Sequence, residues 1–387
     1  MLSFFRKRPV VIKRKNHCIS RKNIDSDAIR VLYRLSRAGY RAYLVGGGVR
    51  DLLLGRQPKD FDVGTDAKPN EIRRLFRNCF LIGRRFRLAH IVFGKKIIET
   101  STFRKTPSKI PEGEDKIQHD DNTFGTPEQD AYRRDFTING IFYDISDFSV
   151  IDHVGGLKDL QKKIIRTIGN AAERFQEDPV RMMRAVKFAS RLEFKIERST
   201  LSALRKHHSD ILKASPPRVC EEIFRLFGFG AGERAFRLMY EIGMMHDLFP
   251  KLADFIDRNG KGKCKTWDYL RAADCDKDNA EISNGVRLAV LFYAMYASRN
   301  ERDDSKAKPK RSASRRQSSA ADLFEAGCCS VPIPRATTGS AAFFINSLFR
   351  FENHEQTARV KRFARHPDFN NAQAFARIVA AAENRPF

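Results

Sequence analysis

The sequence predicts an α+β fold in which a part containing a mixed sheet is followed by an all-helical part. Strand-like and helical runs alternate up to about residue 165, which is typical of strands connected by helices. From Asp178 onward, apolar residues recur at spacings of three and four, as in helices that pack through one face. With 387 residues, the chain is long enough for two or three domains.

The individual elements follow from local signals. Residues 1 to about 24 are basic and weakly patterned, and indicate an arm. A helix is expected across "DSDAIRVLYRLSRAG", with Asp25 or Ser26 as its cap and Gly39 as its stop. Strand-like runs are "YRAYLVG", "KDFDVGT", "HIVFG", "KKIIETSTF" and "FTINGIFYDI". The charged, Ser-rich stretch 299–319 interrupts the helical part and predicts a mobile insertion.

The composition indicates a polyanionic partner and a reducing compartment. The net charge of +25 favours nucleic acid, because Lys and Arg gain affinity by releasing counterions from phosphates. A basic surface kept for solubility, or peripheral contact with a membrane, are the alternatives. Seven cysteines without a C-x-x-C pattern predict reduced thiols and no zinc site. The start lacks the apolar core of a signal peptide, and the apolar run 286–297 is too short to span a bilayer, so we expect a cytoplasmic protein.

The stretch "YLVGGGVRDLLLGRQPKDFDVGTDA", residues 43–67, contains a glycine turn between a strand and a helix. Gly46, Gly47 and Gly48 allow the backbone to turn sharply and to approach a ligand closely. Exposed amides at the start of such a helix suit a phosphate group. Glycine turns of this kind are common, so this feature alone does not decide the function.

Asp60 and Asp62 follow at a spacing of two residues. In a strand, such residues share a face, so both carboxylates point to one side and Phe61 to the other. Two carboxylates this close repel unless a cation lies between them. Mg²⁺ prefers such oxygen ligands, and two ions roughly 3.5–4 Å apart can stabilise phosphoryl transfer. A pair of exposed turn acids after Pro58 is the alternative interpretation.

These motifs resemble the nucleotidyltransferase superfamily that includes DNA polymerase beta. More narrowly, the chain is similar to bacterial poly(A) polymerases and CCA-adding enzymes over roughly residues 17–240. The further matching motifs, in order, are "RRDFTIN" at 133–139, "VGGLKDL" at 154–160, "IIRTIGN" at 164–170 and "EDPVRMMRAVKFA" at 177–189. The resemblance implies an arm and helix (1–37), a nucleotidyltransferase head (38–165), an all-α neck (166–235) and an RNA-binding body and tail (236–387).

The resemblance also implies a set of site residues. Asp60 and Asp62 would hold two Mg²⁺ ions, with Mn²⁺ as an alternative, and Asp135 would complete the catalytic carboxylates. ATP would be the substrate. The nucleotide-binding positions would be Gly46, Gly47, Arg50, Asp51, Arg134, Asn139, Asp178, Arg181, Arg184 and Lys187. Whether Glu99 and Arg104 take part stays open.

The helix predicted after Asp178 would read the base in this family. Pro179 is a favoured first helical residue behind an acidic cap. Arg181, Arg184 and Lys187 recur every three residues and form a basic face, which in an isolated helix could simply be solvated. The family usually has Arg where this chain has Lys187, and Lys lacks the planar fork of Arg.

The stretch "LIGRRFRLAHI", residues 81–91, resembles the signature that distinguishes bacterial poly(A) polymerases from CCA-adding enzymes. Arg84, Arg85 and Arg87 would contact RNA there. We therefore expect template-independent addition of AMP from ATP to RNA 3′ ends, with release of pyrophosphate, by a monomer that promotes RNA turnover with the RNA-decay machinery. A CCA-adding enzyme and a non-catalytic RNA-binding protein on the same fold are the alternatives.

Overall fold

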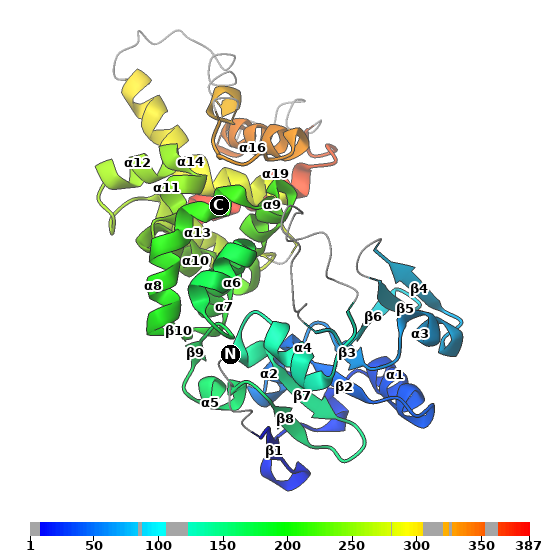
Figure 1. Ribbon diagram of the computed structural model, residues 1–387. Coiled ribbons are helices and arrows are strands. Elements are labelled where there is room, and N and C mark those ends of the chain that lie inside the picture. Colours follow the sequence, from blue (N-terminus) through cyan, green and yellow to red (C-terminus); the bar gives the residue numbers. More distant parts are fainter. Residues whose placement is uncertain are drawn as a thin grey trace. The chain divides into compact units, whose positions relative to one another are not determined.

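The computed structural model describes residues 8–83, 87–105, 123–279, 281–304, 320–324, 327–352 and 363–387 (Figure 1). Two compact units are present. We call the residues up to Glu177 together with Lys195–Thr200 the sheet unit. The helical unit consists of Asp178–Phe194 and the residues from Leu201 onward. The predicted α+β class, with strands first and helices afterwards, is confirmed.

The sheet unit is built on one eight-stranded mixed sheet with the order β1-β8-β7-β2-β3-β6-β5-β4. Strands β3 and β6 are parallel, and all other neighbouring pairs are antiparallel. The bounds are β1 Val10–Ile12, β2 Ala42–Val45, β3 Asp62–Thr65, β4 Cys79–Ile82, β5 Leu88–Phe93, β6 Lys96–Thr102, β7 Ile141–Asp144 and β8 Val150–Asp152. The mixed character agrees with the prediction, although the sheet is larger than expected.

Strand β1 corrects the prediction for the N-terminal arm. Val10 to Ile12 pair antiparallel with β8, with Val11 opposite Ile151. Val10 and Val11 remain exposed, so the segment shows no alternating pattern from which a strand could be recognised. The strand forms because it pairs with β8, which lies far away along the chain, so the local sequence does not reveal it.

Helices cover one face of this sheet. Helix α1, Ser26–Arg37, begins at the predicted cap, where Asp25 Oδ1 accepts from the Asp27 and Ala28 amides at 2.8 and 3.3 Å. Gly39 follows its end with a φ of 88°, a left-handed conformation that suits glycine. Helix α1 packs on β2, β3 and β6, and α3, Pro69–Leu75, packs on β4 and β5. Helix α4, Pro127–Arg133, lies on the opposite face. Its Ala131 packs there with Phe103, with Val45 of β2 and with Phe142 of β7.

Shorter elements complete the sheet unit. Helix α2, Gly47–Leu53, follows β2 directly, and a 3-10 turn, η3, spans Thr137–Asn139. Helix α5, Gly156–Gln161, packs against η3. Strands β9, Ile164–Ile165, and β10, Lys195–Ile196, form a separate parallel pair. Helix α6, Ala171–Glu177, is the last element of the sheet unit before the chain enters the helical unit at Asp178.

The helical unit has a continuous apolar core. Phe236, Phe249 and Phe292 are fully buried, and the ring of Phe249 contacts the rings of both Phe236 and Phe292. Its helices include α7 Val180–Leu192, α8 Arg198–His207 at the boundary, α9 Pro216–Arg225, α10 Gly232–Glu241, α11 Met244–Leu248, α12 Pro250–Arg258, α13 Thr266–Cys275, α14 Asn284–Asp304, α16 Arg335–Ser347, α17 Phe349–Glu352 and α19 Phe369–Ala382.

Helix α14 corrects one boundary. It runs to Asp304, so residues 299–304 are helical and do not belong to the predicted insertion. Residues 305–319 lie outside the described part of the chain. Across the ranges that are described, no helix is both long enough and apolar enough to cross a membrane.

Candidate active site

The predicted glycine turn connects β2 to α2. Gly46 has φ 72° and ψ −136°, a backbone conformation that other residues adopt only with strain. A Cβ atom at this position would lie 2.9 Å from Arg134 Nη1. Glycine is therefore needed at position 46 both for the turn and for the close approach of the Arg134 guanidinium to the backbone.

The two spaced aspartates lie beside this turn. Phe61 is 8% exposed and buried between the exposed Asp60 and the half-buried Asp62, so the predicted alternation is present, although β3 begins only at Asp62. Burial and the Glu99 carboxylate raise the pKa of Asp62 to about 6, and Asp60 adds to the shift, while Arg134 opposes it. Burial disfavours the charged form of Asp62, and the nearby carboxylates disfavour it further.

Arg134 is held in position by α4. Its Nη2 donates to Asp130 Oδ2 at 3.0 Å, and its Nη1 donates to the Asn139 carbonyl oxygen at 3.3 Å. The guanidinium lies next to Gly46 and close enough to Asp62 to influence its pKa. Sequence reasoning identified Arg134 and missed Asp130, although the spacing of four residues on one helix is a signal for such a pair.

Asp135 belongs to a polar network. Its Oδ1 accepts from Asn139 Nδ2 at 3.0 Å, and Asn139 Oδ1 accepts from Arg50 Nη1 at 2.7 Å. Arg50 also donates through Nε to Asp51 Oδ1 at 2.9 Å. Arg50 is 2% exposed and Asp51 4% exposed, so both lie behind the half-buried Asp135 and orient it through Asn139. Their direct contact with a nucleotide stays a prediction.

The "VGGLKDL" motif supports the same network by packing against the turn η3, which carries Asn139. Asp152 Oδ1 accepts from the Gly155 and Gly156 amides at 2.9 and 3.0 Å and thereby caps α5. A Cβ on Gly156 would lie 2.1 Å from the Thr137 carbonyl oxygen. The absence of a side chain lets α5 lie directly against η3, the turn that carries Asn139.

The predicted start of α7 is shifted by one residue, and Asp178 still accepts from the first turn of the helix. The helix begins at Val180 with Pro179 as its cap, one residue later than expected, and the Asp178 carboxylate accepts from the Val180 amide at 3.3 Å. Asp178 also accepts from Arg218 Nη2 of α9 at 2.8 Å. The Arg181 side chain is half-buried.

The basic face of α7 is not simply solvated. Lys187 Nζ lies 2.6 Å from Glu222 Oε2 of α9, and Arg184 lies 4.0 Å from the same carboxyl group. The Lys187 side chain is 13% exposed and that of Glu222 is 4% exposed. Burial lowers the pKa of Lys187, and Glu222 opposes that shift. Sequence reasoning missed Glu222, because nothing local marks it as a partner of α7.

The remaining predicted positions lie on the β5–β6 side. Arg84 and Arg85 lie outside the described residues, whereas Arg87 is exposed just before β5. Glu99 on β6 lies beside Asp62 by register, and its Oε1 is 3.8 Å from His90 Nε2. The backbone amide of Arg104 donates to Asp130 Oδ1 at 3.3 Å. Within the described ranges, no three His, Cys, Asp or Glu side chains converge as a ready metal site.

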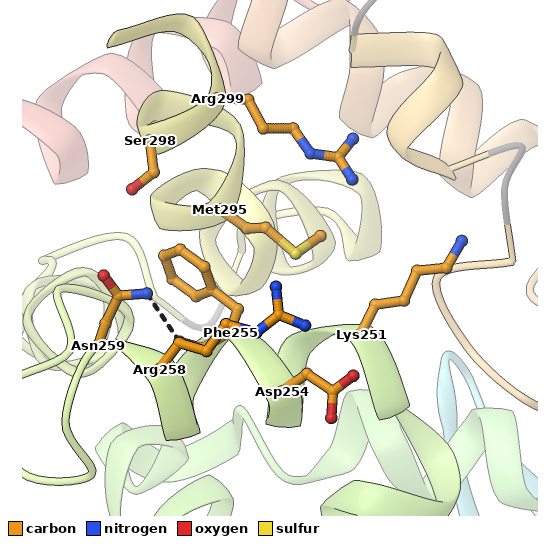
Figure 2. A pocket seen from close by; sticks show the side chains of 8 residues that line it. All are labelled: Lys251, Asp254, Phe255, Arg258, Asn259, Met295, Ser298 and Arg299. Carbon is orange, nitrogen blue, oxygen red and sulfur yellow. Dashed lines mark hydrogen bonds between the residues drawn. The ribbon is translucent and has the colours of Figure 1, made fainter. Parts of the chain in front are cut away.

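The helical unit carries a separate basic pocket between α12 and α14. Figure 2 shows cationic side chains from both helices around it, and its volume is about 240 Å³. Its lining residues are Lys251, Asp254, Phe255, Arg258, Asn259, Met295, Ser298 and Arg299. Three cations and one carboxylate make this a surface suited to anions.

A mixed sheet with a glycine turn after β2 and the paired acids Asp60 and Asp62 at the start of β3 defines a nucleotidyltransferase head. Residues 42–166 match the model of the poly A polymerase head domain, and residues 193–256 match that of the probable RNA and SrmB-binding site of polymerase A. The chain belongs to the poly(A) polymerase family.

Relatives and solved structures agree with this placement. A poly(A) polymerase I of Salmonella typhi is 39% identical over 97% of this chain and 82% of its own length. The poly(A) polymerase I of Escherichia coli O6:H1 is 44% identical over 74% of this chain and 63% of its own length. The CCA-adding enzyme of Bacillus stearothermophilus in complex with CTP is similar in structure, with a TM-score of 0.67 and 26% identity over 93% of this chain and 78% of that chain.

Proposed function

We propose that this chain adds AMP from ATP to RNA 3′ ends without a template and releases pyrophosphate. The observation that carries the proposal is the pair Asp60 and Asp62 beside the Gly46 turn, in a chain of the poly(A) polymerase family. Poly(A) polymerase I relatives match almost the whole chain. The product is an RNA tail that would act in RNA turnover together with the RNA-decay machinery.

The acids fit divalent cations, and we assign two Mg²⁺ ions to Asp60 and Asp62, with Mn²⁺ as an alternative. Burial raises the pKa of Asp62, and the Glu99 and Asp60 carboxylates add to the shift; a cation would relieve the repulsion between these carboxylates. Two protein carboxylates leave positions for phosphate oxygens and water, as Mg²⁺ prefers. When bound, the ions lower the pKa of the primer 3′-hydroxyl and stabilise charge on the leaving pyrophosphate.

The chain's own residues then have separate tasks. The amides at the start of α2 and the Arg134 guanidinium bind the triphosphate. Asp135, oriented by Asn139, accepts from the ribose. In the helical unit, Asp178, Arg181 and Arg184 supply an acceptor and donors for the adenine edge. Lys187 is also assigned to the nucleotide-binding face, and its ion pair with Glu222 supports this helix.

RNA binding is proposed for the basic surfaces. The net charge of +25, the exposed Arg87 and the pocket between α12 and α14 suit phosphate groups. Such contacts hold RNA without reading its sequence. We further propose a monomer that works in the cytoplasm.

The test is extension of labelled RNA with each nucleoside triphosphate alone, and with tRNA lacking its CCA end. We expect long products with ATP only. Addition of CTP and termination after CCA would replace the proposal by a CCA-adding enzyme, the activity in the name of the similar solved structure. No extension with any nucleotide, together with retained RNA binding, would instead favour the non-catalytic alternative.

A further inference from the structure

A row of side chains leads from the catalytic acid to the edge of the sheet. Strands β3, β6, β5 and β4 are neighbours in this order (Figure 1). Phe80 pairs with His90, His90 pairs with Glu99, and the register of β3 and β6 places Glu99 beside Asp62. Paired residues of adjacent strands point to the same face. Asp62, Glu99, His90 and Phe80 therefore share one face across four strands.

The two faces of this part of the sheet differ in their surroundings. On the face covered by α3, the side chains of Cys79, Ala89, Ile91 and Ile98 are buried. On the face of the acids, Phe80 is 60% exposed, Ile82 49% and Ile97 48%. Large apolar side chains on an exposed edge strand promote unwanted association, so their presence on this face calls for a ligand.

We propose that this row, which we call the hairpin platform, holds the last bases of the RNA primer. The inference rests on the proposed function, because the primer 3′-hydroxyl must then lie beside Asp62. With strands spaced by about 4.8 Å, the platform extends roughly 14 Å from the acid to Phe80. The bases just upstream of the 3′ end must lie within that reach. Single-stranded RNA exposes its bases, and aromatic side chains stack on them without reading sequence.

The charges around the platform favour RNA over an apolar protein surface. Arg87 precedes β5 and Lys95 follows it, and both are exposed. Cations at both ends of the central strand suit a phosphodiester backbone that runs across the hairpin while its bases lie on the apolar side chains.

The platform also gives a structural role to the 81–91 stretch. Ile82 pairs with Leu88, and both lie on the same face as His90. Ile82, Leu88 and His90 therefore line the face of the acids, while Ala89 and Ile91 anchor the hairpin in the core. The stretch would act on the primer, next to the reaction centre.

The test compares Phe80→Ala, Phe80→Leu and Phe80→Trp. Because stacking on an aromatic side chain strengthens the binding of a base, Phe80→Ala should raise the RNA KM, and the Kd for RNA without ATP, by about tenfold, with the KM for ATP unchanged. Phe80→Trp should restore RNA affinity, whereas Phe80→Leu, which keeps apolar area but no π-face, should not. Thermal unfolding of each variant shows whether the fold is intact.

Val11→Ala on the opposite edge strand is the matched control, since Val11 is similarly exposed at 52%, and it should leave RNA binding unchanged. RNAs with abasic sites just upstream of the 3′ end should bind the wild type more weakly but should cost Phe80→Ala nothing further. Equal RNA affinity of wild type and Phe80→Ala would overturn the platform, as would rescue by Leu. The Kd comparison holds even if extension assays overturn the proposed function.

Discussion

Lys187 of α7 and Glu222 of α9 form an ion pair with 2.6 Å between Nζ and Oε2, and both side chains are largely withdrawn from solvent. Arg225 Nη1 reaches the other oxygen of Glu222 at 2.8 Å. The pair fixes the helix that carries Asp178, Arg181 and Arg184 against its neighbour. A lysine at position 187 is therefore engaged with protein.

Removing the acid of this pair should destabilise the helical unit strongly. Glu222→Ala leaves Lys187 buried without its partner, and we expect a loss of about 3–5 kcal/mol in the free energy of unfolding. The double variant Lys187→Met/Glu222→Leu replaces both charges by apolar groups and should recover most of that loss. Urea unfolding of the single and double variants measures this, and a double variant as unstable as Glu222→Ala would contradict the assignment.

Asp62→Asn should abolish AMP addition and yet make the metal-free protein more stable. The folded pKa of Asp62 is about 6 against 3.8 for a free carboxyl, so ionisation opposes folding, fully so above pH 6, and the cost disappears as the pH falls from 6 to 3.8. At pH 8, we expect the variant to gain about 2–3 kcal/mol.

As a control, the thermal unfolding temperatures of the wild type and of Asp62→Asn are measured at increasing MgCl₂ concentrations. Bound cations offset the repulsion between the acids, so the wild type should gain stability with Mg²⁺ and Asp62→Asn should gain much less. Equal Mg²⁺ stabilisation of both proteins would place the ion elsewhere, and retained AMP addition by the variant would refute the catalytic role.

Glu197 should produce a pH dependence of opposite sign. Although burial raises its pKa, hydrogen bonds from Ser199 and from the Thr200 amide, together with Arg166, lower the pKa of Glu197 to about 2, from 4.5. The stabilisation is complete above pH 4.5 and is lost as the pH falls toward 2. Glu197→Gln should cost about 1–2 kcal/mol at pH 7.

The readout for Glu197 is the difference in unfolding free energy between wild type and Glu197→Gln across the acid range. That difference should shrink below pH 4.5. A difference that stays constant down to pH 2.5 would show that the carboxylate does not carry the effect. AMP addition at pH 8 should change little, because the described partners of Glu197 are Arg166, Ser199 and Thr200, and none of these is assigned to the site.

Gly156→Ala should disturb the site from a distance. The new methyl group would meet the Thr137 carbonyl at 2.1 Å, and backbone atoms cannot yield as a flexible side chain can. We expect a loss of more than about 2 kcal/mol in stability and a raised KM for ATP, because η3 carries Asn139. Gly262→Ala has open space around its Cβ position and serves as the control. Normal stability of Gly156→Ala would contradict the close packing.

The part of the site that could be predicted from sequence is the part built from short-range geometry. Gly46 at the turn and Asp60 and Asp62 around a buried Phe61 follow from backbone conformation and from alternation along a strand. The cap of α1 by Asp25 follows from hydrogen bonding over three residues. Each of these signals lies within one element and its flanking residues, so no distant partner is needed to recognise it.

Tertiary structure alone decided which residues meet across long separations. The pairing of β1 with β8, the contact of Arg50 with Asn139 and the ion pair of Lys187 with Glu222 join segments that carry no mark of each other. The hairpin platform has the same origin, because strand register determines which face Phe80 shares. Burial and register depend on the whole packed chain, whereas turn geometry and alternation depend only on neighbouring residues.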